Sequence, residues 1–147
     1  MDSKQQASKV IKLLKKEYPK AKIALSSDTP IQLLVAVILS AQCTDKRVNI
    51  VTATLFKKYK AVTDFASADL LTFQQEIKST GFYRNKAKNI IAAAKMIKKD
   101  FNGKIPDNME DLLKLPGVAR KTANIVLSNV YGVVIGIPVD THMLRIN

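Results

Sequence analysis

Apolar residues recur at intervals of three and four positions along most of the chain, which is the spacing of one face of an α-helix. Strand-like alternation is confined to short pieces such as 133–139. Thr44 can cap the helix that follows it, Gly81 can end the helix before it, and Pro106 lies just beyond another stretch. The pattern predicts an all-α protein. The predicted helices are Ser3–Glu17, Pro30–Ser40, Thr44–Tyr59, Ala68–Ser79, Tyr83–Asp100, Met109–Leu113 and Ala119–Tyr131.

Composition narrows the class of partner. At 147 residues the chain has the size of one domain. Lysine and arginine number 24 against 12 acidic residues, and the net charge of +12 favours DNA, RNA or an anionic membrane surface. The longest apolar run, Leu33–Leu39, is far below the roughly 20 residues that a membrane-spanning helix needs. Met1–Lys16 lacks the apolar stretch of a secretory signal. We therefore expect no membrane partner and an intracellular protein, either cytoplasmic in a bacterium or archaeon or associated with DNA.

Metal-binding residues are scarce in this sequence. Cys43 is the sole cysteine and His142 the sole histidine, which argues against an internal disulfide and against cysteine-rich or multi-histidine metal sites. The carboxylates lack the spacing of a Mg²⁺ nuclease site. We predict no metal, a buried apolar role for Cys43, a structural role for His142, and a helix-dipole role for Asp45.

The stretch Leu115–Lys121 reads Leu-Pro-Gly-Val-Ala-Arg-Lys and carries the most specific signal. Pro116 and Gly117 mark a tight turn between two helical stretches, so Arg120 and Lys121 open the second helix. The first N–H groups of a helix have no partner within it and attract anions. The pattern predicts a binding site for a nucleic-acid phosphate.

Lys121 and Asp140 each allow two interpretations. A lysine in the first turn of a helix is most often a solvated cation or a phosphate clamp. The like charge of Arg120, the helix dipole and partial burial in a cleft would instead lower the pKa of Lys121 and make its amine a nucleophile. Asp140 precedes a short helical stretch, where aspartate is a routine cap.

The turn resembles the helix-hairpin-helix of the endonuclease III family of DNA repair glycosylases, and the resemblance runs from about Ile31 to Arg145. One departure is Ala119, where the family usually has a second glycine, so that a methyl group could crowd the phosphate or alter the turn. The other matching stretches are Leu39–Asp45, Gly81–Ala87 and Val139–His142. The resemblance implies a multi-helix DNA glycosylase domain.

The resemblance also implies a domain organisation. In that family further helices follow, and four cysteines near the end hold a [4Fe–4S] cluster. Those cysteines are absent here, so we expect a truncated chain with no cofactor of its own; the alternative is a naturally short chain. Residues 1–20 would form an N-terminal helix that packs on the missing region. Residues 21–133 would form a six-helix domain with the hairpin at about 109–131, and 134–147 would begin the truncated C-terminal region.

Residue roles carry over position by position. The resemblance makes Lys121 the nucleophile and Asp140 the carboxylate that assists its deprotonation and stabilises positive charge on the sugar. Gln42 and Phe82 fall where the family places the residues that fill the space left by an extruded base. The DNA-binding candidates are Gly117, Val118, Ala119 and Arg120 in the hairpin, with Tyr83, Arg84, Lys86 and Lys88 after Phe82.

The implied function is base excision repair by a monomeric enzyme acting on damaged double-stranded DNA. It would be a DNA glycosylase with apurinic/apyrimidinic lyase activity that removes oxidised pyrimidines through a Schiff base on Lys121, followed by β-elimination. Two alternatives stay open at this point. One is a monofunctional adenine-type glycosylase, which acts through activated water. The other is a non-catalytic helix-hairpin-helix module that only binds DNA.

Overall fold

The computed structural model describes residues 3–17 and 24–132, and all regular elements in those ranges are helical. The predicted all-α class is therefore confirmed. Residues 3–10 of the first helix are exposed. The elements are α1 (Ser3–Glu17), α2 (Pro30–Leu39), α3 (Asp45–Lys58), α4 (Val62–Ala66), α5 (Leu70–Glu76), the 3-10 helix η1 (Lys78–Thr80), α6 (Tyr83–Asp100), α7 (Met109–Leu112) and α8 (Arg120–Val130).

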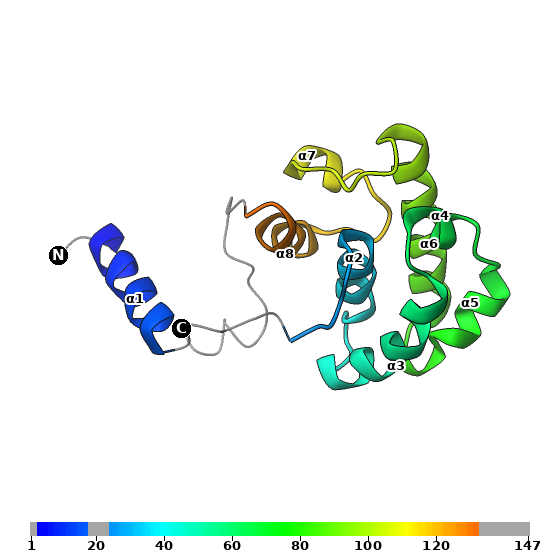
Figure 1. Ribbon diagram of the computed structural model, residues 1–147, viewed down its shortest axis with the longest axis horizontal. Coiled ribbons are helices and arrows are strands. Elements are labelled where there is room, and N and C mark those ends of the chain that lie inside the picture. Colours follow the sequence, from blue (N-terminus) through cyan, green and yellow to red (C-terminus); the bar gives the residue numbers. More distant parts are fainter. Residues whose placement is uncertain (1–2, 18–23, 133–147) are drawn as a thin grey trace.

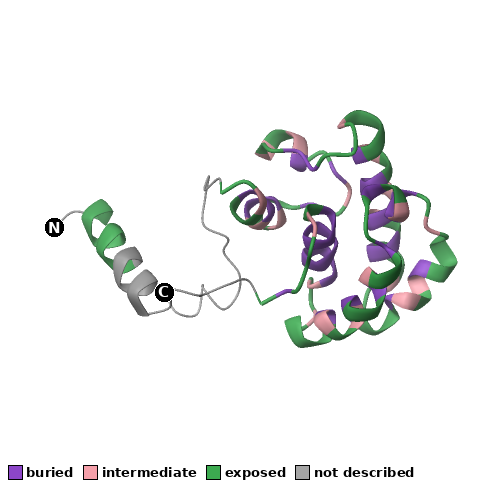
Figure 2. Cartoon of the chain, viewed as in Figure 1, coloured by how far each residue is buried: buried purple, intermediate pink, exposed green. Residues whose placement is uncertain are grey.

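Helix α2 is the centre of the core. Every residue from Ile31 to Leu39 is buried, as expected of a helix that is apolar on all sides. Pro30 occupies the first helical position, and the Thr29 hydroxyl accepts a hydrogen bond from the Gln32 N–H at 3.3 Å. Helices α3, α6 and α8 pack around α2 (Figure 1). Most of α2 has the colour of buried residues in Figure 2.

Helix α6 is the longest element of the bundle and organises the other side of it. Its buried side chains include Ala87, Ile90, Ala93, Ala94 and Ile97, and small residues among them let neighbouring helices approach closely. Helices α4 and α5 pack against α6, and so does α2. The core is thus continuous from α8 through α2 to α6.

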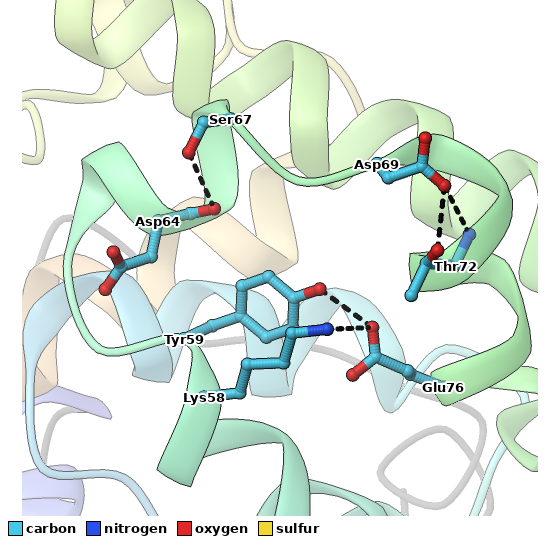
Figure 3. Close-up of polar contacts among 7 residues, drawn as sticks. All are labelled: Lys58, Tyr59, Asp64, Ser67, Asp69, Thr72 and Glu76. Atoms are coloured by element: carbon cyan, nitrogen blue, oxygen red, sulfur yellow. Dashed lines mark hydrogen bonds and ion pairs between the residues drawn. The ribbon is translucent and has the colours of Figure 1, made fainter.

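An aromatic cluster joins the short helices to α3. The Tyr59 ring stacks on Phe65 with centroids 5.3 Å apart and meets Phe73 edge-on at 5.2 Å. The Tyr59 hydroxyl donates to Glu76 Oε1 at 2.7 Å, and the Lys58 ammonium contacts the same oxygen at 3.3 Å (Figure 3). Burial is the main cause that raises the pKa of Tyr59, and the Glu76 hydrogen bond acts in the same direction.

The acidic groups around this cluster are helix caps. Asp64 accepts from the backbone N–H groups of Lys60 and Ala61, each at 3.0 Å, at the start of α4. Asp69 accepts from the Thr72 N–H at 2.9 Å at the start of α5 (Figure 3). These hydrogen bonds to the ionised form lower the pKa of both carboxyl groups. Helix α4 has five residues, too few for periodicity to reveal it, and for that reason the sequence did not predict it.

We predict that Tyr59→Phe lowers the free energy of unfolding by about 1 kcal/mol, because it removes the hydroxyl that bonds Glu76 and keeps the stacked ring. Urea unfolding followed by circular dichroism measures the change. Tyr83→Phe is the matched control, since the Tyr83 hydroxyl makes no hydrogen bond to residues 3–17 or 24–132, and its effect should stay within about 0.5 kcal/mol. Equal losses in the two variants would contradict the assigned role of the hydroxyl.

Candidate nucleic-acid interface

A helical hairpin forms where the sequence predicts one. Helix α7 is capped by Asn108, whose side-chain oxygen accepts from the Asp111 N–H at 2.8 Å. The connecting turn is held by three buried side chains, Leu112, Leu115 and Val118, and by a hydrogen bond from the Val118 N–H to the Leu115 carbonyl at 3.2 Å. Val118 was predicted from the sequence to contact DNA. Its side chain is buried in the core, so only its backbone is available for such a contact.

The N-terminus of α8 lacks a side-chain cap. Ala119 precedes the helix with φ of −92° and has no side-chain atom that can accept a hydrogen bond. Ala119, Arg120 and Lys121 are exposed, so the positive end of the helix dipole faces solvent. A negative φ suits any residue, so the turn forms with alanine in place of the family's glycine. This geometry suits an anion, as the sequence predicts.

The exposure of Lys121 corrects one expectation. Partial burial in a cleft was one of three features expected to activate its amine, and the side chain is exposed instead. It lies in the first turn of α8, whereas Ala123 and Val126 of the same helix are buried. Asp140 and His142 lie outside the described residues.

Gly117 brings the hairpin against α6. Its φ of +79° lies in the left-handed region, which disfavours residues with a Cβ atom. A Cβ at this position would lie 2.9 Å from Asn89 Cβ and 3.3 Å from Asn89 Cγ. Asn89 is in the second turn of α6. The glycine is therefore required twice, for backbone conformation and for the close approach of two elements.

The two predicted wedge residues both have left-handed backbones. Gln42 has φ of +52° and Phe82 has φ of +46°, a conformation that costs a residue with a side chain about 1–3 kcal/mol. Both side chains are exposed, and Phe82 retains 65% of its accessible surface, which is unusual for phenylalanine. Strained backbones of this kind cluster at functional sites.

The Lys86 side chain is buried, whereas the sequence predicted an exposed phosphate contact at this position. The residue is 5% exposed, and its ammonium donates to the carbonyls of Leu39 and Thr80, each at 2.9 Å. Burial lowers the pKa of Lys86, and the nearby Cys43 partly opposes this. Position 86 shares a helical stripe with Ile90 and Ile97, spaced four and seven residues apart, so the inward direction was visible in the sequence.

The other basic candidates are on the surface. Arg84 is exposed with its guanidinium 5.4 Å from the Tyr83 ring centroid, and the Lys78 ammonium lies 5.9 Å from the same ring. Lys88 is also exposed. Two cations therefore flank an aromatic ring beside Phe82, in an arrangement suited to the backbone of a nucleic acid.

Within 3–17 and 24–132, no group of three or more His, Cys, Asp or Glu residues is placed to hold a metal ion. No helix in these ranges is long and apolar enough to cross a bilayer. Cys43 is partly buried against the core, and Asp45 lies exposed in the first turn of α3. A four-cysteine cluster does not fit the residues of this chain, which has one cysteine.

Comparison with known proteins identifies the family. The family model of the HhH-GPD superfamily base excision DNA repair protein matches residues 35–147. This chain belongs to that superfamily. The endonuclease III of a Synechocystis species is 52% identical over 144 residues, covering 98% of this chain and 66% of that protein. The endonuclease III of Bacillus subtilis is 52% identical over 130 residues, covering 88% and 59%. The chain thus spans about two thirds of the length of these curated relatives, or less.

Solved structures agree with the family assignment. A non-covalent complex of endonuclease III with DNA superposes on the HhH-GPD chain with a TM-score of 0.86 and 45% identity, covering 99% of this chain and 68% of that one. A trapped covalent endonuclease III–DNA intermediate gives the same values. A thermostable thymine-DNA glycosylase, at 23% identity and a TM-score of 0.83, shares the fold. The resemblance to the endonuclease III family stated from sequence is confirmed.

We predict that Gly117→Ala lowers the free energy of unfolding by about 3 kcal/mol. The left-handed backbone accounts for roughly 1–2 kcal/mol and the clash with Asn89 for the remainder. Gly103→Ala is the matched control, because Gly103 has φ of +76° and no atom within 4 Å of the added Cβ. Urea unfolding of both variants measures the difference. A Gly117→Ala variant no less stable than Gly103→Ala would contradict the close approach.

A second prediction concerns the buried Lys86. The pKa of Lys86 is lower in the folded chain than in the unfolded chain, where it is about 10.5. Between these two pKa values the unfolded chain binds more protons than the folded chain, so wild-type stability increases as pH rises across this window. The stability difference between wild type and Lys86→Met should therefore shift in favour of wild type as pH rises. Lys88→Met provides the control for loss of one positive charge from α6. Denaturant unfolding between pH 7 and 10.5 measures the slope, and a slope of opposite sign would refute the assignment.

Proposed function

We propose that this chain is the DNA-binding and catalytic part of a base excision repair glycosylase with apurinic/apyrimidinic lyase activity. Its substrate would be intracellular double-stranded DNA that contains an oxidised pyrimidine. The observation that carries the proposal is the uncapped N-terminus of α8, where exposed Lys121 follows a phosphate-binding turn. Two of the similar solved structures support the same proposal, since both are complexes of endonuclease III with DNA.

DNA binding would begin at the positive surface. The net charge of +12 attracts a polyanion, and the N–H groups at the start of α8 donate hydrogen bonds to one phosphate of the DNA backbone. Arg120 and Arg84, both exposed, supply further phosphate contacts. Gln42 and Phe82 then enter the duplex and occupy the space that the extruded nucleotide leaves.

The chemistry would take place on Lys121. Its unprotonated amine attacks the C1′ carbon of the extruded nucleotide, and the glycosidic bond breaks with its electron pair leaving on the base. The sugar ring opens to an imine between Lys121 and C1′. Loss of a C2′ proton then expels the 3′ phosphate by β-elimination, which cuts the strand without hydrolysis. Asp140 would assist deprotonation of Lys121 and stabilise the positive charge that develops on the sugar.

A second candidate is a DNA-binding module without catalysis. The exposure of Lys121 favours it, because the described residues give the amine none of the burial that was expected to activate it. In that case Lys121 and Arg120 would only hold phosphates, and Gln42 and Phe82 would add contacts to the groove.

Borohydride trapping on duplex DNA with an abasic site separates the two candidates. We expect a covalent adduct with wild type and with Arg120→Gln, and none with Lys121→Gln, because only Lys121 supplies the amine. Both substitutions remove one positive charge from the same turn. DNA affinity, measured across salt concentrations, should show the slope of log K against log salt reduced by about 1 in each variant.

The outcomes of the trapping experiment are distinct. Adduct formation by Lys121→Gln at the wild-type rate would remove this lysine from the mechanism. DNA binding by wild type with no adduct would establish the binding module instead.

A further inference from the structure

One buried ammonium connects two turns that are far apart in the sequence. Lys86 Nζ donates to the carbonyl of Leu39, 47 residues away, and to the carbonyl of Thr80, six residues away, both at 2.9 Å. Leu39 is the last residue of α2 and Thr80 the last residue of η1. Carbonyls at helix ends lack a partner within the helix, and a cation is favourable there. Lys86 therefore caps two helix ends at once.

Each capped helix end leads directly into a predicted wedge residue. Gln42 follows Leu39 by three positions, in a turn closed by a hydrogen bond from the Cys43 N–H to the Ser40 carbonyl at 3.2 Å. Phe82 follows Thr80 by two positions. Both have positive φ, a conformation that persists only where the flanking structure holds it.

The same lysine is fixed by the element that Phe82 begins. The Lys86 N–H donates to the Phe82 carbonyl at 3.0 Å, in the first turn of α6. Phe82 is the residue before this helix and has no side-chain cap bond. The Lys86 backbone thus bonds the Phe82 turn, and its side chain reaches the end of α2.

We propose that Lys86 is a positioning residue that holds Gln42 and Phe82 at a set separation, so that both enter the duplex together. The inference rests on the proposed function of these two residues as wedges. Lys86 itself does not touch DNA, because its ammonium is buried and bonded to two carbonyls.

Stability alone does not account for a lysine at this position. Desolvation of a buried ammonium opposes folding, and methionine would fill similar space without that cost. Methionine would, however, leave the Leu39 and Thr80 carbonyls without this donor, which also opposes folding. Because these two effects of Lys86→Met have opposite signs, we expect a small change in stability and a larger change in the two turns.

The test measures DNA binding and wedge insertion separately. The duplex carries a non-cleavable abasic analogue with 2-aminopurine beside it, whose fluorescence rises when insertion unstacks it, and affinity is measured on the same duplex by anisotropy. We expect Lys86→Met to bind with nearly wild-type affinity and to lower the ratio of inserted to uninserted complex on the order of tenfold, the scale for relaxation of one left-handed residue. Lys98→Met, with the same charge loss at an exposed position in the last turn of α6, should keep both properties.

A second variant protects the test against a folding defect. Lys86→Gln keeps an N–H donor but is neutral and one atom shorter, so it cannot reach both carbonyls, and it should also lower insertion. Thermal unfolding shows which variants are folded. If either variant is folded and gives the same ratio of inserted to uninserted complex as wild type, the positioning role is overturned.

Phe82→Ala separates this inference from the proposed function. If wild type raises the fluorescence and Phe82→Ala does not, the wedge assignment holds and the Lys86 result decides the positioning role. If wild type and Phe82→Ala give the same signal, the wedge function is wrong, and the positioning role is overturned with it.

Discussion

The first two turns of α6 are the constraint on which the DNA-facing surface depends. Phe82 precedes the helix, Lys86 bonds the end of α2 that leads to Gln42, and Asn89 lies against Gly117 of the hairpin. Three segments that are distant in the sequence thus meet on one rigid helix. A helix can hold them to a fixed geometry because its own hydrogen bonds and its buried face on α2, α4 and α5 leave it little freedom.

The helical part of the fold was largely predictable from sequence. Helices α2, α3, α6 and α8 each bury a face whose apolar spacing extends over two turns or more, and their observed limits lie close to the predicted ones. Helix α4 and the break between α5 and η1 were not predicted. They depend on single capping contacts, such as those of Asp64, and on the aromatic cluster around Tyr59, which joins residues that are separate in the sequence.

The site was predictable to the extent that short motifs carry it. The turn with Gly117 and the opening of α8 at Arg120 agree with the sequence, and Gln42 and Phe82 are exposed, as their predicted role as wedges requires. The prediction that Lys86 is exposed was wrong, because a charged residue next to other charged residues was assigned to the surface. Its partners are two main-chain carbonyls, and main-chain acceptors leave no mark on the sequence that would identify them.

Lys86 and Lys121 differ in burial and in the partners of their ammonium groups. Lys86 is withdrawn from solvent and its donors are directed to fixed acceptors, so it acts through the turns that it holds. Lys121 is exposed at the positive end of α8, where a negative phosphate and an electrophilic sugar would both be drawn to the same place. A nucleophile at an open helix end gains its low-dielectric surroundings only when DNA covers it. Wedge residues that hold the extruded nucleotide in place would therefore also complete the environment of the amine. On this view, positioning by Lys86 and reaction at Lys121 are coupled through the bound DNA.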